Sequence, residues 1–218
     1  QPNAMGGREV GGLANMLAAH LELENHEHQQ LVQTFWGSPL IAKKPGLKAV
    51  DLFEAVESGK IKAIWIMATN PVVSLPNADQ VKRALDKCQF AVVSDICQDT
   101  DTTQYADVLL PALGWGEKDG TVTNSERRIS RQSQFLDAPE KTKADWWAVS
   151  QVAQKMGFSG FDFKNSHEIF LEHAQLSAYQ NLDVSSRQNI KNFRYFNLQG
   201  LTHLSFEAYQ NLKPIQWP

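Results

Sequence analysis

The sequence is poor in the features that mark several common classes of protein. Its 218 residues contain only two cysteines, Cys88 and Cys97, which excludes a four-cysteine zinc site and a disulfide-rich scaffold. No apolar run approaches the roughly 20 residues that a membrane-spanning helix needs. The net charge of -3 gives no strongly basic surface of the kind that binds nucleic acid. We therefore expect no metal ligand set, no membrane segment and no nucleic-acid partner.

Common nucleotide-binding and catalytic motifs are also missing. Neither GxGxxG nor GxxxxGK followed by Ser or Thr occurs, so an ordinary dinucleotide site or P-loop is not supported. His26 and His28 stand two residues apart, a spacing that does not place them on one helix face, and no third ligand is near. No Ser-His-Asp arrangement is readable, and neither cysteine has the cationic neighbours of a nucleophile.

The chain begins QPNAMGGREVGG, without an initiator Met at position 1 and without the charged and then apolar profile of a signal peptide. This start is typical of a chain cut from a longer protein. The low cysteine content suits a reducing compartment, and we expect a cytoplasmic protein.

Short apolar runs alternate with amphipathic segments. Residues 61–71, 89–95 and 106–111 each predict a strand buried on both faces. Helical spacing of apolar residues predicts helices over four further segments, 51–60, 77–88, 145–157 and 166–181. This alternation predicts an α/β fold, an open and mostly parallel sheet with helices on both faces. We expect the α/β segment to occupy residues 1–160 and residues 161–218 to form a helical C-terminal extension of the same domain.

Three loops follow the predicted strands, and ligands of open α/β sheets bind beyond the carboxyl ends of the strands. The loops read ATNPVVSLPN, SDICQDTDTTQ and PALGWGEKDGTVTNSERR, and each is rich in groups that bind polar ligands. We therefore expect a polar ligand at this edge of the sheet.

Several polar side chains of these loops have two interpretations. The Asp95 carboxylate can accept two hydrogen bonds from the Watson–Crick edge of guanine, or Ser94 and Asp95 can satisfy the backbone of a turn. Asn70 precedes a proline, as in many turns. Lys118 lies in GEKDG, which suits an anionic ligand or a solvated charge cluster. Asp145 suits the cap of the helix that follows it.

The run TDTTQYADVLLPALGWGEKDGTVTNSERRISRQ resembles a segment of the molybdopterin-dependent oxidoreductase family, which includes formate dehydrogenases, nitrate reductases and relatives of dimethyl sulfoxide reductase. In that family an Ala-Asp-aliphatic-Leu-Pro strand leads into a glycine-rich loop with Glu-Lys and Asn-x-Glu-Arg-Arg. The resemblance implies that the segment after residue 113, which is rich in glycine and charged residues, wraps around a large anionic pterin nucleotide.

The resemblance extends from QPNAMGGREVGGL through IWIMATNPVVSLP and VVSD to KADWWAVSQVAQKMG and PIQWP. Within the family, the REVGG, ATNP and TNSERRISRQ stretches are most similar to the catalytic subunits of assimilatory nitrate reductases. This implies reduction of nitrate to nitrite by oxygen-atom transfer at molybdenum. Two alternatives stay open: the same segment of a formate dehydrogenase, and a stand-alone α/β nucleotide-binding module without catalysis.

The resemblance also implies that the chain is part of an enzyme and inactive alone. Family members hold molybdenum with two molybdopterin guanine dinucleotides (Mo-bis-MGD) and carry an N-terminal 4Fe–4S cluster, a molybdenum-ligating residue and a C-terminal β-barrel. This chain resembles the α/β domain that grips one dinucleotide. Its implied partners are the remaining domains of the same polypeptide, an electron-donor protein or domain, and nitrate.

Individual residues of this sequence match positions with known roles in the family, and the resemblance implies the same roles here. The resemblance implies that Asn70 contacts the nucleotide end of the cofactor and that Ser94 and Asp95 hold the guanine. Lys118 and Asp145 match further positions that line the cofactor.

Arg8 and Glu9 belong to the REVGG stretch that nitrate reductases share. The resemblance makes Arg8 a candidate for steering nitrate towards molybdenum, with Glu9 orienting it. The alternative is an ordinary ion pair at the surface.

Overall fold

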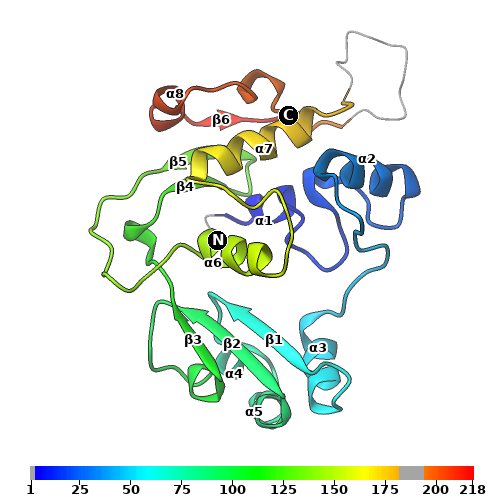
Figure 1. The fold of residues 1–218 in the computed structure, drawn as a ribbon, viewed down its shortest axis with the longest axis vertical. Helices are drawn as coiled ribbons and strands as arrows, with labels where there is room; N and C mark the ends of the chain where they lie inside the picture. Colours follow the sequence, from blue (N-terminus) through cyan, green and yellow to red (C-terminus); the bar gives the residue numbers. More distant parts are fainter. Residues whose placement is uncertain (1–2, 182–193) are drawn as a thin grey trace. The chain divides into compact units, whose positions relative to one another are not determined.

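The computed structural model describes residues 3–181 and 194–218 (Figure 1). They form two compact units. Among the described residues, the first unit comprises 3–46, 119–133, 162–181 and 194–218, and the second comprises 47–118 and 134–161. The chain thus passes between the units more than once, and its last change of unit, between residues 161 and 162, lies beside the boundary that we expected at residue 160. Part of the expected C-terminal extension, residues 182–193, lies outside the described residues.

A three-stranded parallel sheet forms the centre of the second unit (Figure 1). Its strands are β1 (Ala63–Met67), β2 (Phe90–Asp95) and β3 (Val108–Pro111), in the order β1-β2-β3. All three lie inside the apolar runs that predicted them, and the α/β fold class is confirmed. Met67 pairs with Ser94 and Asp95 pairs with Pro111, so the three strands end at the same edge.

Helices of the second unit cover this sheet through a shared apolar core. The core cluster joins Phe53 and Val56 of α3 with Val81 and Leu85 of α5 and with residues of β1 and β2. The side chain of Asn77 accepts a hydrogen bond from Gln80 N and thereby caps α5. The helices are α3 (Ala49–Glu57), α4 (Pro71–Ser74), α5 (Ala78–Lys87) and α6 (Asp145–Lys155).

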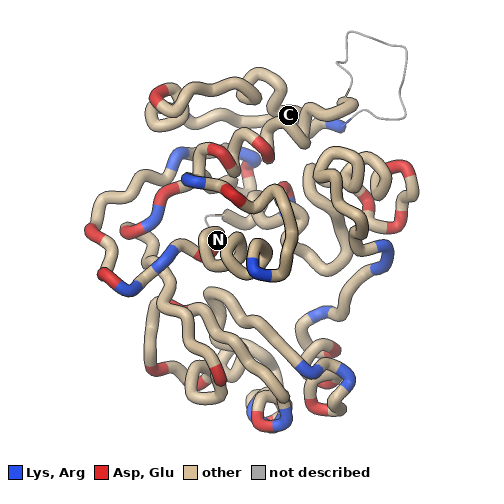
Figure 2. The backbone as a smooth tube through the Cα atoms, viewed as in Figure 1, with Lys and Arg blue, Asp and Glu red and all other residues tan. Residues whose placement is uncertain are grey.

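Figure 2 shows acidic and basic residues close together where α3 and α5 lie side by side. Arg83 Nε donates to Glu57 Oε1 at 2.8 Å. This hydrogen bond is the main reason why the pKa of Glu57 is lowered from its ordinary value. The two helices are therefore linked at their solvent-facing side as well as through the apolar core.

The first unit contains an antiparallel sheet that we did not predict. It has the order β4 (Gly120–Thr123), β5 (Arg128–Gln132) and β6 (Ile215–Gln216). The glycine-rich run, expected to be a loop, therefore continues into a β-hairpin. Asn124 Oδ1 accepts from the backbone N–H groups of Glu126 and Arg128, which fixes the turn. The helices of this unit are α1 (Gly6–Glu9), η1 (Ala18–His20), α2 (His26–Trp36), α7 (Ser166–Ala178), η5 (Gln199–Leu201) and α8 (Phe206–Gln210).

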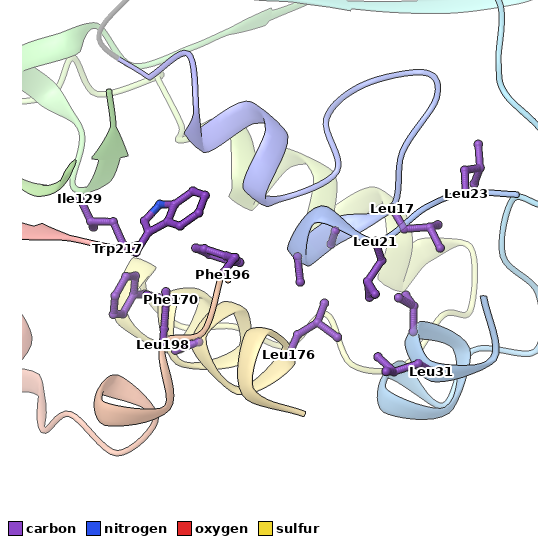
Figure 3. Close-up of a cluster of buried hydrophobic side chains, with 14 of the residues drawn as sticks. Leu17, Leu21, Leu23, Leu31, Ile129, Phe170, Leu176, Phe196, Leu198 and Trp217 are labelled. Atoms are coloured by element: carbon purple, nitrogen blue, oxygen red, sulfur yellow. The ribbon is translucent and has the colours of Figure 1, made fainter. Parts of the chain in front are cut away.

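The C-terminal segment supplies central residues of the first unit's core. Phe196, Tyr209 and Trp217 are buried, and Figure 3 shows Phe196 and Trp217 beside Phe170 of α7. The same cluster includes Leu17, Leu21 and Leu31 from the N-terminal part of the chain. The described part of residues 161–218 is thus integral to this core, and it contributes a strand as well as helices.

No helix in the described ranges combines the length and the apolar character needed to cross a membrane.

We expect Gly11→Ala to destabilise the first unit. Gly11 has φ +71°, and a Cβ there would lie 2.5 Å from Ala18 N, so both the backbone conformation and the close approach require glycine. We expect a loss of about 2 kcal/mol in the free energy of unfolding, measured by urea denaturation. Gly7→Ala is the matched control, because a Cβ at Gly7 meets nothing within 4 Å. Equal stability of the two variants would contradict the close approach.

Candidate functional site

A cavity of about 420 Å³ lies at the carboxyl edge of the parallel sheet, within the second unit. Loops after all three strands line it, together with the start of α6. Four of the residues predicted to bind the cofactor line this cavity together: Asn70, Asp95, Lys118 and Asp145. We call it the nucleotide pocket, after the ligand that the sequence predicts for these residues. Within the described ranges, no group of three His, Cys, Asp or Glu side chains is arranged to hold a metal ion.

Asn70 is fixed in the pocket by a buried threonine. Thr102 Oγ1 donates to Asn70 Oδ1 at 2.6 Å and accepts from Val72 N at 3.3 Å. Thr102 is 1% exposed, so it ties the loop after β1 to the loop after β2 inside the protein. Ala68, which also lines the pocket, has φ +53°, a conformation that is uncommon outside glycine and that is often found at functional sites.

Asp95 accepts a hydrogen bond within the turn after β2, and its carboxylate can accept further hydrogen bonds from a ligand. Its Oδ1 accepts from Cys97 N at 2.9 Å, so the turn interpretation of this residue is confirmed. Oδ2 has no hydrogen-bond partner among the described residues, and the carboxylate lines the pocket. An ionised carboxylate offers about four acceptor positions, so the turn occupies only part of its capacity.

Ser94 is not among the residues that line the pocket. Its side chain is buried, and its hydroxyl accepts a hydrogen bond from Trp65 Nε1 at 2.9 Å. Trp65 and Ser94 lie on neighbouring strands, so this bond joins β1 to β2. A contact between Ser94 and guanine stays a prediction.

Lys118 and Asp145 form an ion pair at the pocket wall. Lys118 Nζ lies 3.7 Å from Asp145 Oδ2, and each side chain is 31% exposed. Asp145 Oδ1 is buried and has no hydrogen-bond partner among the described residues. The helix cap is Ala144, so Asp145 is the first residue of α6 and not its cap. A carboxylate in the first turn is stabilised by the helix dipole.

Sequence reasoning missed the residues that shape the pocket around these four. Thr100 and Cys97 line it from the loop after β2, and Trp115 lines it from the loop after β3. Thr100 N donates to Thr103 Oγ1 at 2.7 Å, which folds the threonine-rich stretch on itself. The cluster of threonines between two strands was a usable signal, because hydroxyls commonly satisfy turn backbones.

Arg8 and Glu9 lie in the first unit and have different environments. Arg8 is exposed and lines a separate cavity of about 640 Å³. Glu9 is 3% exposed; its Oε1 accepts from Trp217 Nε1 and its Oε2 from Thr123 Oγ1, both at 2.7 Å. His173 Nε2 lies 3.7 Å from Oε2. Glu9 is therefore an internal anchor of α1, and the interpretation as a surface ion pair is wrong for it.

The fold and the pocket together define an α/β protein whose parallel sheet carries a pocket at its carboxyl edge. Residues 3–155 match the family described as molybdopterin oxidoreductase, and the chain belongs to this family.

Individual relatives agree with this assignment. A nitrate reductase from Klebsiella oxytoca is 52% identical over 219 residues, which cover 100% of this chain and 24% of the relative. An F420-dependent formate dehydrogenase subunit alpha from Methanocaldococcus jannaschii is 36% identical over 174 residues, 79% of this chain and 25% of the relative. The chain thus spans roughly a quarter of the length of these curated relatives.

A solved structure shares the fold. Acetylene hydratase from Pelobacter acetylenicus superposes with a TM-score of 0.56 at 20% sequence identity, covering 78% of this chain and 20% of that one. At this identity the likeness concerns the fold alone.

Proposed function

We propose that the nucleotide pocket holds the guanine nucleotide end of a molybdopterin guanine dinucleotide, within a protein that reduces nitrate to nitrite. One observation carries the proposal. Asn70, Asp95, Lys118 and Asp145 were predicted to serve this ligand from separate loops, and all four line one pocket of the second unit. Membership of the molybdopterin oxidoreductase family supports the pterin part of the ligand.

The chemistry of the pocket residues fits a guanine nucleotide. Guanine presents a ring N–H and an amino group side by side, and the Asp95 carboxylate accepts from such paired donors. Lys118 supplies a cation for a phosphate, at the cost of loosening its pair with Asp145. Trp115 also lines the pocket, and aromatic side chains stack on nucleotide bases.

In this proposal the chain binds and orients the cofactor, and the bound molybdenum centre supplies oxygen-atom transfer. Asn70 is held by Thr102 and therefore presents a fixed amide to the nucleotide. Asp95 is held by its turn and selects guanine. The 4Fe–4S cluster, the second dinucleotide, the remaining domains and an electron donor belong to parts outside this chain, and the whole protein works in the cytoplasm.

Nitrate is the proposed substrate because the nitrate reductase from Klebsiella oxytoca is 52% identical, against 36% for the formate dehydrogenase subunit. The test is to purify the longest polypeptide of the source cells that contains this chain, measure its molybdenum, and assay it with nitrate and with formate. We expect a molybdenum protein that produces nitrite. Formate oxidation without nitrite production would favour the formate dehydrogenase alternative, and a metal-free 24.5 kDa band would favour a stand-alone binding module.

A further inference from the structure

Thr102 is a buried threonine outside the lining of the nucleotide pocket, and its hydroxyl contacts Asn70, which does line the pocket. We propose that Thr102 is a positioning residue that fixes the polarity of the Asn70 amide, so that Asn70 Nδ2 donates a hydrogen bond to an acceptor oxygen of the bound nucleotide. That the ligand is a nucleotide rests on the proposed function. Thr102 then decides which chemical group of the ligand this side of the pocket accepts.

The hydroxyl of Thr102 has a single hydrogen to donate, and its oxygen can accept from others. Thr102 Oγ1 accepts from Val72 N at 3.3 Å. The residue is 1% exposed, so its hydroxyl hydrogen has no access to bulk water. Among the described residues, its second hydrogen-bond partner is the Asn70 side chain, at 2.6 Å. The hydroxyl hydrogen therefore points to Asn70, and the amide atom that faces it must be the acceptor Oδ1.

The opposite orientation of the Asn70 amide would be unfavourable. With Nδ2 facing Thr102, the hydroxyl oxygen would accept from two N–H groups, and the hydroxyl hydrogen would have no acceptor inside the protein. A buried donor without a partner costs free energy. Thr102 thus holds Oδ1 towards the interior and leaves Nδ2 as the free end of the amide. In the ranges that the structure describes, Nδ2 has no hydrogen-bond partner, and it is not a buried atom.

Thr102 also replaces the Asn70 side chain as a helix cap. Asn70 is the N-cap of α4, and the side chain of an N-cap Asn commonly accepts from backbone N–H groups of the first turn. Here the Asn70 side chain makes no capping hydrogen bond, and Thr102 accepts from Val72 N instead. The backbone carbonyl of Asn70 accepts from Val73 N and Ser74 N. Asn70 is therefore held in place while its amide N–H groups stay available to a ligand.

A fixed N–H donor selects an acceptor on the ligand. The acceptor oxygens of a guanine nucleotide belong to its phosphates, its ribose and the carbonyl group of the base. The N–H groups of guanine would be repelled by Asn70 Nδ2 and are matched by the Asp95 carboxylate, which accepts. The pocket therefore offers side chains of opposite polarity, and the Thr102 hydroxyl determines the polarity of one of them.

The experiment measures the affinity of the full 218-residue chain for GDP and for guanosine by isothermal titration at fixed salt. Thr102→Val keeps the shape of the side chain and removes the hydroxyl, and we expect it to weaken GDP binding about tenfold. Thr102→Ser keeps the hydroxyl and should restore most of the affinity. Thr142→Val is the matched control, since the Thr142 hydroxyl donates to Pro139 O and the residue does not line the pocket. A loss with GDP alone assigns the contact to a phosphate oxygen, and an equal loss with guanosine assigns it to the base or ribose.

A double substitution separates positioning from general support of the loop. In the Asn70→Ala background Thr102 has no amide to orient, so adding Thr102→Val should weaken GDP binding no further. If the two losses simply added, Thr102 would act independently of Asn70, and the proposal would be wrong.

Asn70→Asp tests the polarity of the amide without altering the buried threonine, and it decides if Thr102→Val fails to fold. One carboxylate oxygen still accepts from Thr102, while the other replaces the Nδ2 donor by an acceptor. We expect GDP binding to weaken by more than about tenfold. GDP binding as tight as that of the unaltered chain would overturn the role of Thr102 and leave the nucleotide pocket in place. Failure of the unaltered chain to bind GDP would overturn both.

Discussion

Asp95→Asn should lower the affinity of the chain for GDP by about ten- to a hundredfold. GDP is a stand-in for the cofactor's nucleotide end, since it carries the same guanine and a diphosphate. The substitution removes the charge and replaces one acceptor by an amide donor, which faces the donors of guanine. The local fold should persist, because the Asn carbonyl oxygen can still accept from Cys97 N as Asp95 Oδ1 does.

Isothermal titration at fixed salt measures this effect, and two comparisons sharpen it. Asp99→Asn removes a carboxylate from the same loop at an exposed position that does not line the pocket, so its GDP affinity should match the unaltered chain. ADP lacks the paired donors of guanine, so its affinity should be insensitive to Asp95→Asn. GDP affinity unchanged by Asp95→Asn would remove this residue from the site.

The second large effect concerns the stability of the first unit. Glu9→Ala should lower its free energy of unfolding by about 3 kcal/mol or more, because it leaves the buried donors Thr123 Oγ1 and Trp217 Nε1 without an acceptor. His173 loses its carboxylate neighbour at the same time. Urea unfolding followed by tryptophan fluorescence measures the loss, and Trp217 itself reports on it.

Glu9→Gln keeps one acceptor oxygen and should lose less stability than Glu9→Ala. Glu24→Ala is the control, since Glu24 is an exposed glutamate of the same unit and should change stability by at most about 0.5 kcal/mol. If Glu9→Ala were as stable as Glu24→Ala, the buried network would have no structural role, and the account of how α1 is anchored would fail.

The parallel sheet was predictable because its signal is local. The runs around 61–71, 89–95 and 106–111 are apolar, bounded by turn residues and separated by amphipathic segments, and β1, β2 and β3 lie inside them. Once the strands are parallel, their carboxyl ends meet at one edge. The nearness of Asn70 and Asp95 therefore follows from the fold.

The first unit was not predictable in the same way, since its contacts join distant parts of the chain. The β4–β5 hairpin mixes glycine, threonine and arginine and has no clean apolar alternation. Its third strand, β6, lies more than eighty residues further along. The partners of Glu9 are likewise at positions 123, 173 and 217. Patterns in neighbouring residues do not reveal contacts between such distant positions, because these contacts form only through tertiary packing.

The candidate site was predicted in part, and mainly through the family resemblance. Lys118 and Asp145 had ordinary local interpretations, and only the resemblance singled them out. Ser94 illustrates the limit of this approach, because its strand position directs its hydroxyl to Trp65. Thr102, which holds Asn70, was missed, since its burial can be recognised only in the folded chain.

The most direct test of the nucleotide pocket uses the two cysteines. Cys97 is exposed and lines the pocket, whereas Cys88 lies outside it and serves as an internal reference. The rate of alkylation of each thiol would be measured by mass spectrometry with and without saturating GDP. We expect GDP, and not ADP, to slow the alkylation of Cys97 while that of Cys88 stays unchanged. Equal alkylation rates of Cys97 with and without GDP would contradict the assignment of this pocket to a guanine nucleotide.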